Sequence, residues 1–182
     1  FSGPVGDSRQ NFYTSGQNLE INDISSANDG YGIIKFRNKT STGGNGSNPT
    51  WVDTDFPFFR LAEIYLNYAE AVVRGGSGGS SATALTYINN LRQRAYGNAS
   101  GNIVSGDLTL PFLIDERAKE LHWEAVRRTD LIRFGLFTEG TYLWAWKGNT
   151  LNGQAVGAHR KLYPIPSADL VANPNLRQND GY

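Results

Sequence analysis

Two stretches of apolar side chains at helical spacing, separated by a short glycine-rich loop, most constrain the fold of this chain. Between positions 58 and 74 the apolar residues recur every three or four positions, as Leu61, Ile64, Tyr65, Tyr68, Ala69 and Val72. That period places them on one face of an α-helix. Gly75 and Gly76 end the stretch, and a second one then places Leu85, Ile88 and Leu91 in the same way. The pattern predicts a helical hairpin at residues 58–95, with these two apolar faces turned toward each other.

A hairpin of this size resembles the helix pairs of tetratricopeptide repeats. One hairpin cannot bury both of its faces, so it needs neighbouring elements stacked on it. We expect those neighbours in an N-terminal part of the same protein that these 182 residues lack, because the chain has no Met and begins with Phe1.

The remaining segments are predicted to be irregular, apart from one further helix. Residues 1–57 form a loop-rich lead-in of Gly, Ser, Asn and Thr, with one strand-like run from Tyr31 to Phe36. Residues 111–134 carry acids early and bases late, which suits the dipole of one long charged helix. Residues 135–182 form an irregular C-terminal segment. The predicted fold class is mostly α, with extensive loops.

The composition excludes several classes of protein and site. Seventeen Lys and Arg balance seventeen Asp and Glu, so no partnership with nucleic acid is expected. The absence of Cys removes disulfides, thiolate metal sites and a lipid-anchor cysteine from these residues. His122 and His159 have no metal-ligand spacing around them. We expect no metal and no cofactor.

The charged segment allows an enzymatic interpretation. On one ideal helix a single side holds Glu116, Glu120, Trp123, Glu124, Arg127, Leu131 and Phe134. Positions four apart on a helix rise by about 6 Å, and the carboxyl pairs of glycoside hydrolases lie about 5 to 9.5 Å apart. Glu116 and Glu120 would then be the acid and the nucleophile.

The structural interpretation is that arginines neutralise these glutamates. A general acid needs a raised pKa, whereas neighbouring guanidinium groups lower the pKa of a carboxyl. We favour this interpretation and predict an ion-pair network tied to the C-terminal segment. Its predicted members are Glu116, Arg117, Glu120, Glu124, Arg127, Asp130 and Arg133. Trp123 is expected to pack beside them.

Loop aromatics are the candidate ligand contacts, because sugar rings stack on flat exposed aromatics and loops often carry binding residues. The predicted ligand-binding residues are Trp51, Tyr142, Trp144 and Trp146. The alternative for Trp144 and Trp146 is that they alternate along a half-buried strand and pack on one core face. The usual burial of large aromatics favours packing for this pair.

Two motifs in the last seventy residues resemble a known family. The first, from Pro111 to Gly135, contains Glu116, Arg117, Glu120, Leu121, Trp123, Glu124, Arg127, Asp130, Leu131 and Arg133. The second contains Leu162, Tyr163, Pro164, Ile165, Pro166, Asn173, Pro174, Asn175, Leu176, Gln178, Asn179, Asp180, Gly181 and Tyr182. A weaker match is the strand motif of Tyr31, Lys35 and Phe36. Together they resemble the C-terminal part of the SusD/RagB family.

The resemblance implies a SusD-like α-helical fold and a nutrient-binding protein that is not an enzyme. It implies a cell-surface lipoprotein of Bacteroidetes-type outer membranes, anchored through an N-terminal part absent from this chain. Such a protein captures oligosaccharide or another nutrient and passes it to a SusC-like TonB-dependent transporter. In the family the charged helix is scaffold and ligand contacts come largely from loops upstream, so no binding residue is carried over.

Two alternatives remain open at this point. One is a glycoside hydrolase that uses Glu116 and Glu120. The other is a helical-repeat adaptor that binds only protein.

Overall fold

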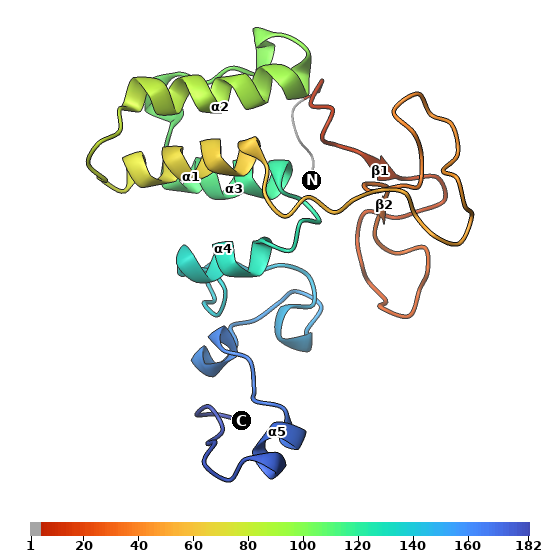
Figure 1. Cartoon of the computed structure of the whole chain (residues 1–182), viewed down its shortest axis with the longest axis vertical. Coiled ribbons are helices and arrows are strands. Elements are labelled where there is room, and N and C mark those ends of the chain that lie inside the picture. The colour runs from red at the N-terminus through yellow and green to blue at the C-terminus, as the bar shows by residue number, and fades with distance from the viewer. Residues whose placement is uncertain (1–4) are drawn as a thin grey trace. The chain divides into compact units, whose positions relative to one another are not determined.

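The computed structural model describes residues 5–182, and the chain divides into two compact units (Figure 1). The first unit ends at Arg127 and the second runs from Arg128 to Tyr182. The first contains β1 (Phe12–Tyr13), β2 (Gly32–Ile33), α1 (Leu61–Val73), α2 (Ser81–Tyr96) and α3 (Leu110–Glu120). The boundary falls at the start of α4 (Arg127–Arg133), and the second unit also contains α5 (Ser167–Ala172). The prediction of a mostly α-helical fold is confirmed. No helix within residues 5–182 has the length and apolar character needed to cross a membrane.

The hairpin of α1 and α2 has well-defined ends. The Ser80 hydroxyl accepts a hydrogen bond from the Thr83 backbone N–H at 3.1 Å and so caps the start of α2. Gly97 ends α2 in the left-handed region at φ 70°. At the start of α1 the preceding residue, Arg60, makes no side-chain cap to the helix backbone. Helix α1 begins at Leu61, three residues later than the predicted position 58.

The buried face of α1 differs from the predicted one. Leu61 and Ile64 are 63% and 54% exposed, so they do not face α2 as predicted. The fully buried apolar positions on α1 are Ala62, Leu66 and Ala69, of which Ala69 belonged to the predicted face. Small alanine side chains allow two helices to approach closely. Apolar residues cover a wide face of α1, so the sequence pattern alone does not tell which side of that face packs on α2. The common core contains Ala62, Leu66, Ala69, Ala84, Ile88, Leu91, Leu108, Leu113 and Leu121.

The predicted long helix at residues 111–134 is wrong, because it is broken into α3 and α4. The intervening residues Trp123 and Ala125 both have φ of 60°, a backbone region that no α-helix uses. The carbonyl oxygen of Glu120 accepts a bond from Arg60 Nη2 at 2.7 Å, and that of His122 accepts one from Lys35 Nζ at 2.7 Å. Arg60 and Lys35 thus bind carbonyl oxygens that would accept backbone N–H groups if the helix continued.

The lead-in holds little regular structure. Strands β1 and β2 pair antiparallel, with Phe12 opposite Ile33. The strand-like run predicted at residues 31–36 is therefore a strand only at Gly32–Ile33. Side-chain bonds to backbone amides hold the turns, as where Asp29 Oδ2 accepts from the N–H groups of Asn22 and Asp23 at 2.9 Å.

The second unit is closed by its terminal residues. The Gln178 side-chain amide makes two bonds to the backbone of Ile165, at 2.8 and 2.9 Å. The Tyr182 hydroxyl donates to the Leu162 carbonyl oxygen at 2.8 Å. The Arg128 guanidinium lies 4.0 Å from the ring centroid of Tyr163. These contacts give the closing motif of the sequence a structural role, because they join the end of the chain to residues 162–165.

Candidate functional site

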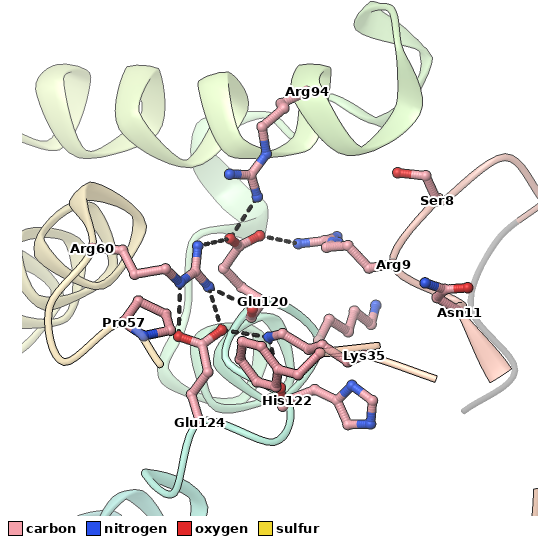
Figure 2. Close-up of a pocket in the computed structure, with 12 residues that line it drawn as sticks. Ser8, Arg9, Asn11, Lys35, Pro57, Arg60, Arg94, Glu120, His122 and Glu124 are labelled. Carbon is pink, nitrogen blue, oxygen red and sulfur yellow. Dashed lines mark hydrogen bonds and ion pairs between the residues drawn. The ribbon is translucent and has the colours of Figure 1, made fainter. Parts of the chain in front are cut away.

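Three buried glutamates form the centre of a charge cluster in the first unit, and Figure 2 shows two of them, Glu120 and Glu124. Glu116 and Glu120 lie on α3, and Glu124 lies in the segment that follows its last turn. Their side chains are 0%, 1% and 5% exposed. Burial of this degree removes water from ionised carboxyls, so each one needs cationic partners.

Four arginines reach the carboxylates of Glu116 and Glu120, from the lead-in, from the residue before α1 and from α2. Glu116 accepts from Arg9 Nη1 at 2.8 Å and from Arg92 Nη1 at 2.7 Å. Glu120 accepts from Arg60 at 2.9 Å, from Arg94 at 2.5 Å and from Arg9 at 3.3 Å.

Glu124 completes the cluster from beyond the end of α3. Arg60 donates two hydrogen bonds to the Glu124 carboxylate, from Nε at 2.7 Å and from Nη2 at 2.8 Å. Lys35 Nζ lies 2.5 Å from Glu124 Oε1. The two-bond geometry is the strong form of an arginine–carboxylate pair. Arg60 thus links Glu124 to Glu120, and both to the start of α1.

The two glutamates of this linkage are held ionised. Burial alone would raise the pKa of Glu120, but hydrogen bonds from Arg94 and Arg60 outweigh it and leave the pKa below its usual value. For Glu124, burial is likewise outweighed by hydrogen bonds from Arg60 and Lys35, and its pKa is also lowered. A glycosidase acid must carry a proton at working pH. The environment of Glu120 therefore opposes the role of proton donor.

The other residues of the predicted network lie in different contacts. Arg117 Nη1 donates to Asn67 Oδ1 at 2.7 Å, and Arg127 Nη1 donates to the Ile114 carbonyl oxygen at 2.8 Å. Asp130 and Arg133 form a pair at 2.8 Å in the second unit. The cationic partners that sequence reasoning missed are Arg9, Lys35, Arg60, Arg92 and Arg94. Only Lys35 stood in a motif, and nothing in that motif indicated an ion pair.

A pocket of about 320 Å³ opens beside the cluster. Its lining residues are Ser8, Arg9, Asn11, Lys35, Phe36, Pro57, Arg60, Arg94, Lys119, Glu120, His122 and Glu124. Figure 2 shows Arg94, Arg60 and Arg9 approaching Glu120 from different elements.

A second hollow, of about 560 Å³, lies in the second unit. Trp144, 38% exposed, forms part of its wall beside Phe137, with ring centroids 6.3 Å apart and planes at 29°. The polar side chains of its lining belong to Lys147, Asn149, Gln154, His159 and Arg160. The hollow thus combines a flat aromatic face with several hydrogen-bonding groups.

Buried Lys147 supports the Trp144 loop. Its ammonium donates to the carbonyl oxygens of Glu139 at 2.5 Å and Tyr142 at 2.7 Å, and it lies 4.6 Å from the Trp144 ring centroid. Burial lowers its pKa. Gly153, at φ 75°, packs where a Cβ would collide with the Trp144 carbonyl oxygen. The aromatic wall is therefore held by a charged group and by a close backbone contact.

The remaining candidate aromatics are scattered. Trp51 is 74% exposed in the first unit, whereas Tyr142 and Trp146 are half-buried in the second. The predicted alternation of Trp144 and Trp146 along a strand is wrong, because Trp146 has φ of 66° and lies in a turn. The expectation that Trp123 packs is also wrong, since this side chain is 63% exposed. Over the part of the chain that the structure describes, no group of His, Asp and Glu is arranged to hold a metal ion.

Comparison with known proteins gives consistent matches. A family model described as the SusD family matches residues 4–182. Starch-binding protein SusD from Bacteroides thetaiotaomicron is 41% identical over 182 residues, which cover 98% of this chain and 31% of that protein. SusD-like protein P25 from Formosa agariphila is 35% identical over 125 residues, which cover 67% of this chain and 23% of that protein. The chain therefore spans about a third of the length of SusD.

Several solved structures share the fold of this chain. Surface glycan-binding protein A from Bacteroides thetaiotaomicron in complex with laminarihexaose is 27% identical at a TM-score of 0.57, over 81% of this chain and 29% of that one. A SusD superfamily protein from Parabacteroides distasonis matches in fold over 100% of this chain and 40% of its own, at a TM-score of 0.65 and 24% identity. By its sequence along nearly its whole length, the chain belongs to the SusD family.

Proposed function

We propose that these 182 residues are part of a cell-surface protein that binds oligosaccharide and does not cleave it. The 41% identity to the starch-binding protein SusD is the observation that carries this proposal. The similarity to a surface glycan-binding protein in complex with laminarihexaose supports the same ligand class. We propose further that the protein is lipid-anchored in the outer membrane and passes its ligand to a SusC-like TonB-dependent transporter.

The contribution of this chain to glycan binding is assigned to the Trp144 hollow. A sugar presents apolar C–H faces to an aromatic ring and hydroxyls to polar side chains, and this hollow offers both. Its volume of about 560 Å³ falls within the range of about 300 to 1,000 Å³ typical of small-molecule sites. Trp51 is a second exposed candidate aromatic, but it lines neither the Trp144 hollow nor the pocket beside the charge cluster.

The buried ion pairs favour binding over hydrolysis. Glu116 and Glu120 each accept bonds from at least two arginines, and their side chains are almost fully buried. A hydrolytic pair needs one protonated carboxyl and access to the scissile bond. Glu120 is held ionised and Glu116 does not line the pocket, so the cluster is assigned to the scaffold.

The chain is further proposed to act within a longer protein, here called the parent protein. Exposed apolar side chains gather at the approach to α1 and on its first turn, as Trp51, Val52, Phe56, Phe58, Phe59, Leu61 and Ile64. Phe58 and Phe59 are 83% and 82% exposed. Apolar groups in such number mark a surface that another element covers.

The test is glycan binding by the parent protein with Trp144 replaced by Ala. We expect the affinity for maltohexaose or laminarihexaose to fall about fivefold or more, because a lost stacking contact is worth about 1 kcal/mol. Trp123→Ala is the matched control, since it removes an exposed tryptophan from the first unit. Equal affinities for the two variants would reject the assignment of the hollow. Glycan binding by neither variant nor parent would reject the function.

A further inference from the structure

Positive charge exceeds negative charge around the pocket in the first unit. Its lining contains five cationic side chains, those of Arg9, Lys35, Arg60, Arg94 and Lys119. It contains two carboxylates, those of Glu120 and Glu124. The excess persists when the charges behind the wall are included, because Asp7 and Glu116 add two carboxylates while Arg92 adds one more cation. Six cations therefore face four carboxylates.

The carboxylates of Glu120 and Glu124 already accept bonds on both of their oxygens. Both oxygens of Glu124 accept from Arg60, and one of them also accepts from Lys35. Both oxygens of Glu120 are likewise used by arginines. The lining cations with the fewest bonds to these carboxylates are Arg94 and Lys119.

Two such cations retain free donors. Arg94 uses one nitrogen on Glu120 while its side chain is 57% exposed. Lys119 is half-buried, and within residues 5–182 its ammonium makes neither an ion pair nor a hydrogen bond, although its charge contributes to lowering the pKa of Asp7. Arg94 comes from α2 and Lys119 from α3, so two helices hold these charges at one opening.

A third polar group of the lining, the His122 ring, has a nitrogen without a partner. His122 Nε2 is buried and has no hydrogen-bond partner, although the His122 ring packs on Phe12 at a centroid distance of 5.2 Å. A buried polar atom without a partner destabilises the folded chain unless a ligand or water satisfies it. Burial and the nearby Lys35 charge lower the His122 pKa, so the ring is neutral at pH 7 and one of its nitrogens carries a proton.

We propose that this pocket binds a singly charged oxyanion on a sugar, either a uronic acid carboxylate or a sulfate ester. Arg94 and Lys119 bind the anion, and His122 Nε2 donates a hydrogen bond to the same ligand. A pocket of about 320 Å³ is at the lower end of the range for small-molecule sites, about 300 to 1,000 Å³, as expected for one sugar residue. The choice of a sugar ligand rests on the proposed glycan-binding function, whereas the site itself is separate from the Trp144 hollow, which lies in the other unit.

The experiment titrates the parent protein with glucuronate, with glucose 6-sulfate and with glucose at constant ionic strength. Binding is followed by calorimetry and by the NMR signals of the His122 ring. We expect both anions to bind and to shift the ring signals, and glucose to do neither. The relative affinities of the two anions identify whether the natural group is carboxylate or sulfate.

Variants locate the site. Lys119→Gln removes a charge that makes no structural bond, and it should weaken binding of the preferred anion about fivefold, the scale of one partly exposed charge pair. Lys39→Gln removes a charge outside the pocket lining and should leave the affinity unchanged. Arg94→Gln should weaken binding similarly, provided its melting temperature stays near that of the parent.

Three outcomes would overturn the proposal. They are no binding of either anion, equal affinity in Lys119→Gln and Lys39→Gln, and His122 signals that do not respond. If glucuronate binding depends on Lys119 while the affinity for neutral oligosaccharides does not depend on Trp144, the anion site is supported and the assignment of the Trp144 hollow is rejected.

Discussion

Replacing Arg60 by Ala should open the junction between α1 and α3. Arg60 immediately precedes α1 and makes four hydrogen bonds to residues at and beyond the end of α3. Three go to the carboxylates of Glu120 and Glu124, and one goes to the Glu120 carbonyl oxygen. No other described side chain bonds to both carboxylates.

The size of the effect follows from burial. Breaking a buried ion pair from one side destabilises by about 3 to 5 kcal/mol. The Arg60 side chain is 23% exposed, and after its loss Glu120 keeps Arg9 and Arg94 while Glu124 keeps Lys35. Because both carboxylates retain other cations, we expect a destabilisation at the lower end of this range, about 3 kcal/mol. That corresponds to roughly a 150-fold change in the equilibrium constant for local opening.

Amide hydrogen exchange of the parent protein measures this change. Peptides that cover α1 and α3 should exchange faster by roughly that factor, since exchange reports local opening. Arg60→Lys keeps the charge but not the planar fork, so its effect should be intermediate. Arg37→Ala is the matched control, because Arg37 is exposed in the same unit and such a surface change is worth about 0.5 kcal/mol or less. An Arg60→Ala effect no larger than this control would refute the buried-network reasoning.

Three further predictions concern acid, the second unit and the exposed apolar surface. The pKa values of Glu120 and Glu124 are lowered in the folded chain, so their contribution to stability is full above an ordinary glutamate pKa of about 4.3 and is lost as the pH falls through the folded values. A free energy of unfolding that stays constant from about pH 5 to about pH 3 would contradict this. Lys147→Met leaves backbone carbonyls without their buried donor and should destabilise residues 136–147 by about 2 kcal/mol, measured as faster exchange there. The 182-residue chain should self-associate in light scattering, and Phe58→Ser with Phe59→Ser should reduce this association. No change in particle size would count against an interface at these residues.

Local periodicity was enough to predict the hairpin but not the break after α3. The spacing of apolar residues carries the helix signal within one segment, and α1 and α2 formed where that signal was strong. The break depends on Arg60 and Lys35, which lie at least sixty positions upstream and bind carbonyls at the end of α3. Neither Trp123 nor Ala125 is a residue type that signals positive φ.

The site was predictable only on its acidic side. Glu116, Glu120 and Glu124 were identified by their mutual spacing, and all three lie in the charge cluster. Their cationic partners come from residues 9 to 94, and contacts over such separations leave no local pattern. The hollow around Trp144 depends on a turn and on buried Lys147, whereas sequence reasoning assumed an alternating strand.

Oligosaccharide binding without cleavage is tested most directly by titrating the parent protein with maltohexaose and laminarihexaose. The heat of binding and the released reducing ends are measured together. We expect saturable binding of at least one of these glycans, with the oligosaccharide recovered at its original length. Shortened products whose formation stops in the Glu116→Gln variant would contradict it and support the hydrolytic interpretation. No binding of any oligosaccharide would contradict the proposed function itself.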